Sequence, residues 1–166
     1  MSRGIAAVAV LATLAVLWPA PAAAEVHKVR LDGLQEVPTV STPASGQLVL
    51  DIHHDETQID YQLTYEGIST HVRFAHIHIG APGTTGGIVL FLCDNQGAAP
   101  TATPACPEGS GTVTGTLTAV DIMPQPAQGI AAGQFDEIIT MIRLGAAYGN
   151  LHSEQSQAGE IRGNLK

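Results

Sequence analysis

Residues 46–65 have the sequence GQLVLDIHHDETQIDYQLTY, and this stretch decides the fold. Large apolar side chains occupy every second position in residues 46–52 and again in residues 58–65, and the connection between them is polar. Since successive side chains of a β-strand point to opposite faces, each segment presents one apolar face. A short polar connection between two such segments is typical of a hairpin. The stretch therefore predicts two antiparallel strands that bury one face of a sheet.

Further segments of the same kind lie on both sides of this hairpin, and turns rich in Gly and Pro separate them. One segment differs, because Phe135, Ile138, Ile139 and Ile142 have the i, i+3, i+4, i+7 spacing of an amphipathic helix. The chain is therefore predicted to be mostly β, an antiparallel β-sandwich or barrel with one α-helix near residues 134–144. The additional strands are expected at residues 26–31, 72–79, 88–93, 111–122, 147–151 and 160–165.

The first 24 residues have the pattern of an export signal. Arg3 precedes an almost unbroken apolar run over residues 4–17, and the small residues 22–24 come directly before Glu25. The alternative is a membrane anchor, but the run is shorter than the roughly 20 residues that span a bilayer. We expect residues 1–24 to be a signal peptide that is removed, and residues 25–166 to form one domain. The protein would then be periplasmic or extracellular.

The charge of the chain excludes some partners. The whole chain has a formal net charge of −8, and loss of the basic Arg3 with the signal makes the mature domain more negative still. Such a surface repels phosphate backbones and anionic lipid, so we expect neither nucleic acid nor, after signal removal, a membrane as partner. Cations are the ligands that this charge favours.

Cys93 and Cys106 are the only cysteines in the chain. Two nearby cysteines in an oxidising compartment usually pair, and the loop between them is rich in Ala, Pro and Thr and cannot pack a core. A disulfide would close this loop and stabilise the domain by about 3 kcal/mol. The alternative makes Cys93 a copper ligand, and we rank it lower because a partner cysteine is present.

Three histidines are candidate metal ligands. Residues 74–79 read FAHIHI, so His76 and His78 lie two positions apart on an expected strand and point to the same face. Such a pair supplies two nitrogen ligands for copper or zinc, but a third must come from elsewhere. His152, in a strand-like segment late in the chain, is the best third candidate. Glu160 and Arg162 follow at i, i+2 spacing on the last strand. Glu160 is a candidate fourth ligand, or a hydrogen-bond acceptor for an imidazole. Arg162 is a candidate partner of Glu160 or of an anion.

Two other interpretations of these residues stay open. In the first, the same histidines with Glu160 and Arg162 form a metal-free polar network that fixes strand register in a binding or structural module. In the second, a bound copper ion supports redox chemistry such as superoxide dismutation; no substrate pocket is evident in the sequence, so this enzymatic interpretation ranks below the other two. Ser69 has no orienting acid beside it and is not expected to be a nucleophile. The remaining histidines, His27, His53, His54 and His71, are left outside the predicted site.

Three blocks of the sequence carry a resemblance to a known family. The chain resembles the CHRD domain family, which is named for chordin and also occurs in many exported bacterial proteins. The match keeps the family's order and spans nearly the whole expected domain; Ser153 and residues 155–158 depart from the usual pattern in one loop. The blocks are LDGLQEVP at residues 31–38 with ASG at 44–46, AHIHIGAPG at 75–83 with GGIV at 86–89, and YGNLHS at 148–153 with GEIRG at 159–163.

The resemblance implies a fold more than a reaction. It implies an all-β domain and, in this chain, an exported single-domain member. By fold-level analogy the domain is similar to the sandwich of Cu/Zn superoxide dismutase, which also uses H-x-H on a strand. In chordin these domains belong to an extracellular binding protein, so another extracellular protein is a candidate partner beside a metal ion. The family brings no established reaction with it.

Overall fold

A computed structural model describes residues 25–166, and the predicted signal peptide lies outside the described residues. The strands form one antiparallel sheet in the order β5-β4-β7-β8-β1-β2-β3-β6, which confirms the predicted mostly β fold. The strands are β1 (Glu25–Asp32), β2 (Ser45–Ile52), β3 (Gln58–Glu66), β4 (Val72–Ile79), β5 (Ile88–Asp94), β6 (Gly111–Thr118), β7 (Ala147–Ser153) and β8 (Ile161–Asn164).

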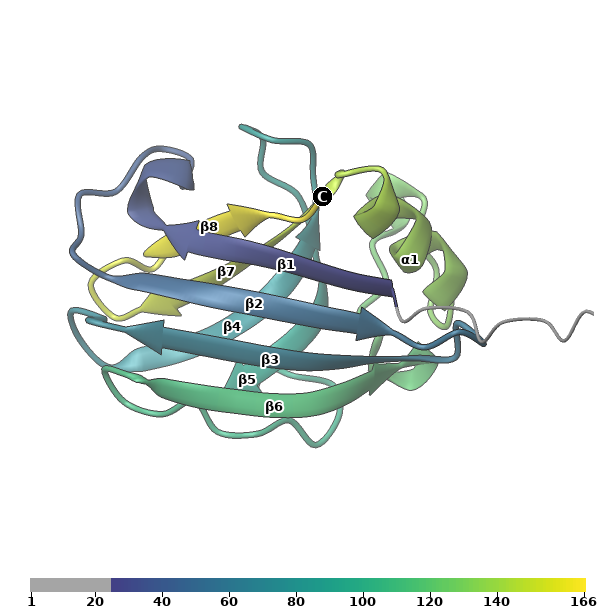
Figure 1. Cartoon of the computed structure of the whole chain (residues 1–166), viewed down its shortest axis with the longest axis horizontal. Helices are drawn as coiled ribbons and strands as arrows, with labels where there is room; N and C mark the ends of the chain where they lie inside the picture. Colours follow the sequence, from purple (N-terminus) through teal and green to yellow (C-terminus); the bar gives the residue numbers. More distant parts are fainter. Residues whose placement is uncertain (1–24) are drawn as a thin grey trace, which may run out of the picture.

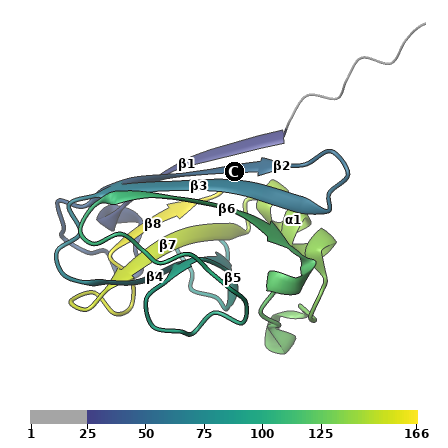
Figure 2. The ribbon, with the colours of Figure 1, turned by 90° about the horizontal axis from the view of Figure 1, so that it is seen from below.

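The sheet folds over on itself into two layers, as Figures 1 and 2 show. One layer contains β1, β2, β3 and β6, and the other contains β8, β7, β4 and β5. The fold lies between β1 and β8, where a single registered pair, Asp32 with Arg162, joins the two layers. Near the opposite edges, the Tyr61 hydroxyl of β3, which lies beside the edge strand β6, donates a 2.6 Å hydrogen bond to the Leu92 carbonyl of the edge strand β5. The result is a nearly closed, barrel-like sheet.

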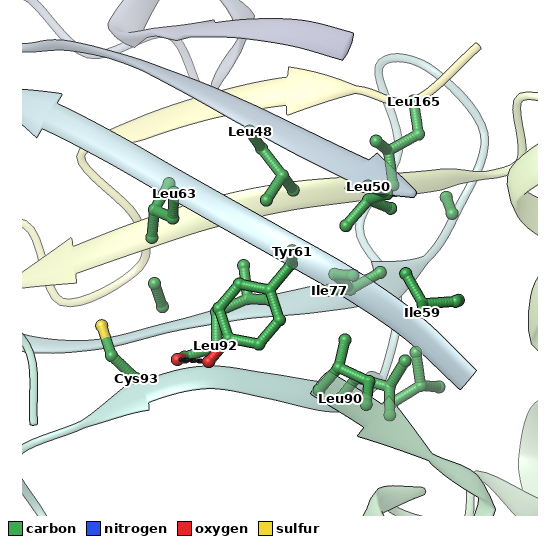
Figure 3. Packing of buried hydrophobic residues seen from close by; sticks show 14 of the residues in the cluster. Leu48, Leu50, Ile59, Tyr61, Leu63, Ile77, Leu90, Leu92, Cys93 and Leu165 are labelled. Atoms are coloured by element: carbon green, nitrogen blue, oxygen red, sulfur yellow. Dashed lines mark hydrogen bonds between the residues drawn. The ribbon is translucent and has the colours of Figure 1, made fainter. Parts of the chain in front are cut away.

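The space between the layers is an apolar core (Figure 3). The β2–β3 hairpin contributes Leu48, Leu50, Ile59 and Leu63, all fully buried, and Ile77 of β4 meets them from the other layer. Burial of each such side chain stabilises the fold by about 1.5–3 kcal/mol. The apolar alternation predicted from the sequence is therefore what holds the two layers together.

The helix α1 (Phe135–Arg143) packs at one end of the barrel (Figure 1). Its buried residues are the four of the predicted stripe. At its last turn the Arg143 guanidinium donates hydrogen bonds to Glu25 at 2.6 Å and to Glu56 at 2.7 Å, which ties the helix to β1 and to the β2–β3 turn. Among residues 25–166, no helix is long and apolar enough to cross a membrane. Short 3-10 helices occur at η1 (Gly33–Gln35), η2 (Ala119–Asp121) and η3 (Pro126–Gln128).

Several element boundaries differ from the sequence prediction. The strand expected through residue 122 ends at Thr118, because the Asp121 carboxylate accepts hydrogen bonds from the Thr118 backbone and hydroxyl and starts η2. The strand expected at residues 147–151 continues to Ser153 and so includes His152. The last strand begins at Ile161, which leaves Glu160 in the preceding connection.

The predicted disulfide is formed. Cys93 in β5 is bonded to Cys106, with Cα atoms 5.0 Å apart, and both residues are buried. Cys93 is therefore committed to the disulfide and does not offer a thiolate to a metal. The bond anchors the loop that crosses from β5 towards β6 at the edge where the barrel nearly closes.

Candidate metal centre

The three predicted histidines lie on two neighbouring strands. In β4, Ala75 and Ile77 belong to the apolar core, so the alternate residues His76 and His78 face away from the barrel interior. β7 pairs with β4 in a register that sets Asn150 opposite His76 and His152 opposite Phe74. Because adjacent strands align their faces, the three imidazoles gather on one side of this pair of strands.

This face of the sheet is buried as well. His76 is fully buried, and His78 and His152 are each only 7% exposed. Two connections cover the group: the Gly86 carbonyl contacts His78 Nδ1 at 2.8 Å and the Gln157 carbonyl contacts His152 Nδ1 at 2.9 Å. The second face of an antiparallel sheet is commonly exposed to solvent. Here the two connections cover it, so the histidines are buried.

The imidazole rings are in mutual contact. The ring centroid of His76 lies 4.6 Å from that of His78 and 4.6 Å from that of His152. Three ring nitrogens, one from each residue, lie within 4.8 Å of one another. Nitrogens bound to a single tetrahedral ion at 2.0–2.1 Å are about 3.3 Å apart, so the rings must move inwards to share one ion.

Hydrogen bonds select one tautomer of each ring. A carbonyl oxygen only accepts, so the Nδ1 atoms of His78 and His152 carry protons that they donate to Gly86 and Gln157. His76 Nδ1 likewise lies 3.0 Å from Asn150 Oδ1. Each Nε2 atom is then left with a lone pair. The Nε2 atoms of His76 and His152 are buried without any hydrogen-bond partner, and His78 Nε2 lies 3.1 Å from the same Asn150 oxygen.

All three imidazoles are held in the neutral form. Burial lowers the pKa of His152 to about 4, and burial also lowers the pKa of His78. The pKa of His76 lies well below its usual value because of burial and then the proximity of His152 and His78. Neutral imidazole is the form that binds a metal ion, so these histidines need not lose a proton to do so near neutral pH.

Aromatic side chains make the walls of the group. The Phe74 ring lies 4.9 Å from His76 and 5.0 Å from His152, and Phe91 meets His76 edge-on at 5.2 Å. Tyr148 stacks on His78 at 4.6 Å with nearly parallel planes. The group contains no carboxylate or thiolate. Its donor set is therefore imidazole alone.

The structure does not bring Glu160 into the histidine group. The Glu160 carboxylate is fully buried and accepts hydrogen bonds from the Ser69 backbone at 3.1 Å, the Ser69 hydroxyl at 3.0 Å and the Thr42 hydroxyl at 2.9 Å. It thereby joins three segments of chain. Ser69, which was not expected to be a nucleophile, serves as a hydrogen-bond donor.

Arg162 contacts the histidine group indirectly, through Tyr148 and the loop at residues 80–87. Its guanidinium carbon lies 3.4 Å from the Tyr148 ring centroid, so Arg162, Tyr148 and His78 form a stack. The guanidinium donates to the Thr84 carbonyl at 2.7 Å and to the Asn164 side chain at 3.1 Å, and not to Glu160. Arg162 thereby fastens the loop at residues 80–87, which carries the Gly86 carbonyl, over the histidines.

Two residues of the site were missed by sequence reasoning. Asn150 is 3% exposed and contacts both His76 and His78 through its side-chain oxygen; its i, i+2 spacing from His152 could have revealed it. Glu36 follows η1 and is 6% exposed, and its pKa is raised to about 7 by burial despite the charge of Arg162 and hydrogen bonds from Val37 and Asn150. Nothing in its irregular segment indicated that it would be buried beside Asn150.

The other four histidines lie outside the group. His27 contacts Glu25 and the carbonyl of Lys166, His53 pairs with Asp60 and His71 with Glu108. His54 is exposed in the β2–β3 turn.

Comparison with known proteins gives the family. No curated protein and no solved structure matches the chain. A family model, the CHRD domain, matches residues 28–165. The match includes all three sequence blocks, the histidine group, Asn150 and Glu36. The chain therefore belongs to the CHRD domain family.

Proposed function

We propose that this protein is an exported CHRD-domain protein that binds copper or zinc through His76, His78 and His152. Two buried and unpartnered Nε2 atoms, those of His76 and His152, carry the proposal. A buried polar atom without a partner destabilises a fold by about 1–3 kcal/mol. A cation that accepted these lone pairs would remove that penalty, and no proton is available to do so because the imidazoles stay neutral.

The donor set favours a particular class of metal. Imidazole suits copper and zinc, whereas magnesium and calcium prefer oxygen ligands, of which this group has none from a carboxylate. A carbonyl oxygen on each Nδ1 proton is the arrangement that orients metal-binding histidines in general. A water molecule, rather than Glu160, would complete the coordination, because the Glu160 carboxylate is engaged by Ser69 and Thr42.

Several features support export. A disulfide is typical of an oxidising compartment, the CHRD family suggests an extracellular module, and residues 1–24 have the pattern of a signal peptide. We therefore propose that residues 25–166 are the mature domain, located in the periplasm or outside the cell. The metal ion is the proposed ligand, another extracellular protein is a candidate partner, and we assign no reaction.

The competing function is a metal-free module in which the histidines only fix the strands. The hydrogen bond between His76 and Asn150 favours it, because a bond between β4 and β7 would help to hold these strands in register. Under this hypothesis removal of metal would have no effect on stability, since nothing would be bound to the folded state alone.

Calorimetric titration of the demetallated mature protein with Zn²⁺ and with Cu²⁺ tests the two functions. We expect one ion per chain, a rise in melting temperature with metal, and at least a 100-fold loss of affinity in His76→Asn and His152→Asn. His71→Asn is the matched control, because His71 is exposed and outside the group, and it should bind like wild type. Equal uptake by wild type and both site variants would refute the proposal.

A further inference from the structure

Two buried carboxylates lie near the histidine group, and they differ in their partners. Both oxygens of Glu160 accept hydrogen bonds, from Ser69 and Thr42. Glu36, although 6% exposed, has a buried Oε1 atom with no partner. A buried carboxylate oxygen without a hydrogen-bond partner destabilises a fold. The position of Glu36 therefore needs an explanation, whereas the hydrogen bonds of Glu160 already account for its burial.

The surroundings of Glu36 leave it few donors. Burial raises its pKa to about 7, and only Arg162, the Val37 backbone and the Asn150 side chain act in the opposite direction. Gly159 fits tightly over it: a Cβ at that position would lie 2.4 Å from Glu36 Oε1. The carboxylate is therefore fixed between the β7–β8 connection and Asn150, and Asn150 is its link to the histidines.

Above its pKa of about 7, the Glu36 carboxylate is ionised and only accepts hydrogen bonds, and this constrains the Asn150 amide. The amide must present its NH₂ group to Glu36 and hence its oxygen to the imidazoles, 3.0 Å from His76 Nδ1 and 3.1 Å from His78 Nε2. Facing this oxygen, His76 must carry its proton on Nδ1, which leaves Nε2 free. The lone pair of His78 Nε2 likewise has no donor to occupy it.

The reversed amide would have the opposite effect. Its NH₂ group would donate to His76 Nδ1 and to His78 Nε2, so the lone pair of His78 would be occupied and His76 would carry its proton on Nε2. The carbonyl oxygen of Asn150 would then face the Glu36 carboxylate, and the two would repel each other. Glu36 thus excludes the arrangement that satisfies the histidines without a metal.

From this geometry we infer that Glu36 is a positioning residue of the histidine centre: through Asn150 it fixes the imidazoles of His76 and His78 in the tautomer that can bind a cation. The benefit of this tautomer rests on the proposed metal-binding function. The effect of Glu36 on the tautomer itself concerns the metal-free protein, where it can be tested separately. Glu36 itself contributes no ligand atom, since it acts only through the amide.

The first measurement is ¹⁵N NMR of the imidazoles in the metal-free mature protein, at a pH above the range in which Glu36 titrates. We expect wild-type His76 to be protonated on Nδ1. In Glu36→Gln, which keeps the shape but can donate to a reversed Asn150 amide, we expect the proton on Nε2. A wild-type His76 protonated on Nε2 overturns the inference without any variant, so the test does not depend on whether Glu36→Gln folds.

The second measurement is the affinity for Zn²⁺. Groups that orient metal ligands typically contribute 10- to 100-fold to affinity, and we expect Glu36→Gln to weaken zinc binding by that factor. In an Asn150→Asp background, residue 150 has no NH₂ group to reverse, so the same change at Glu36 should no longer weaken binding. Wild-type affinity and tautomer in Glu36→Gln, or an equal loss in both backgrounds, overturn the inference.

Glu160→Gln is the matched control. It also neutralises a buried carboxylate near the start of β8, but one held by Ser69 and Thr42. We expect it to lower stability while zinc affinity stays within about twofold of wild type and the His76 tautomer is unchanged. If wild type binds no metal, the proposed function fails, whereas the tautomer of His76 still decides the role of Glu36.

Discussion

The outer faces of the two layers of the barrel differ in how deeply they are buried. In β3, buried and exposed residues alternate along the strand, and the exposed positions include Asp60, Gln62 and Thr64. In β7 every residue is buried, including the polar Asn150 and His152. The first layer is an ordinary half-buried sheet, whereas in the second layer loops cover the outer face as well.

The difference indicates where function lies. A second interior that served stability alone would be lined with aliphatic side chains, because buried polar groups are costly unless they are fully paired. Here it holds three neutral imidazoles, of which His76 and His152 keep unpartnered nitrogens. Departures from an otherwise consistent pattern are expected at functional sites. The enclosed face is therefore where we place the proposed metal site.

The largest expected effect concerns the interior that both layers share. Leu48 of β2 is fully buried, and its Cδ2 atom would lie 2.7 Å from a side chain at Gly149 of β7, so the layers touch there. We expect Leu48→Ala to lower the free energy of unfolding by about 3 kcal/mol, from lost burial and a cavity. Urea denaturation measures this. A loss below about 1 kcal/mol would mean that the layers are not packed through Leu48.

The next effect distinguishes the enclosed face by its pH dependence. The pKa of His152 is about 4 when folded against 6.5 in the unfolded chain, so the unfolded chain binds the proton first as pH falls. Stability is therefore lost between about pH 6.5 and pH 4. Between pH 7.5 and pH 4.5, the free energy of unfolding of metal-free wild type should fall by about 2.5 kcal/mol more than that of metal-free His152→Asn.

His53, in the β2–β3 turn of the other layer, is the control for this prediction. Its pKa is raised, chiefly by a hydrogen bond to Asp60. A raised pKa has the opposite effect on stability. The stabilisation is present below the pKa of the unfolded chain and is lost as pH rises through the folded pKa. His53→Asn should therefore not reproduce the acid effect of His152→Asn. Parallel stability curves for wild type and His152→Asn between pH 7.5 and 4.5 would contradict the burial of His152 as a neutral base.

The smallest effect is expected on the outer face of the first layer. Gln62 is exposed at the centre of β3, and no side-chain hydrogen bond involves it among the described residues. We expect Gln62→Ala to change the free energy of unfolding by no more than about 0.5 kcal/mol. Thermal melting would measure the change. A loss as large as that in Leu48→Ala would remove the contrast between the outer faces of the two layers.

The sequence predicted the site in part, and each success and failure has a local cause. The pairing of His76 with His78 was predictable because two positions on one strand share a face. His152 was found because its segment was recognised as a strand. Glu160 was expected near the histidines, but β8 begins one residue later and Ser69 binds its carboxylate. Glu36 gave no signal, since its segment has no periodicity from which burial can be inferred.

By itself, the sequence determined the strands, the helix, the cysteine pair and the common face of His76 and His78. These features depend on neighbours within a few residues, where backbone geometry fixes the direction of each side chain. Only the tertiary structure decided that loops seal this face, that His152 completes the group, and that Glu36 reaches it through Asn150. Those contacts join segments that are far apart in the chain, such as His76 and Asn150, and they exist only once the sheet has folded over.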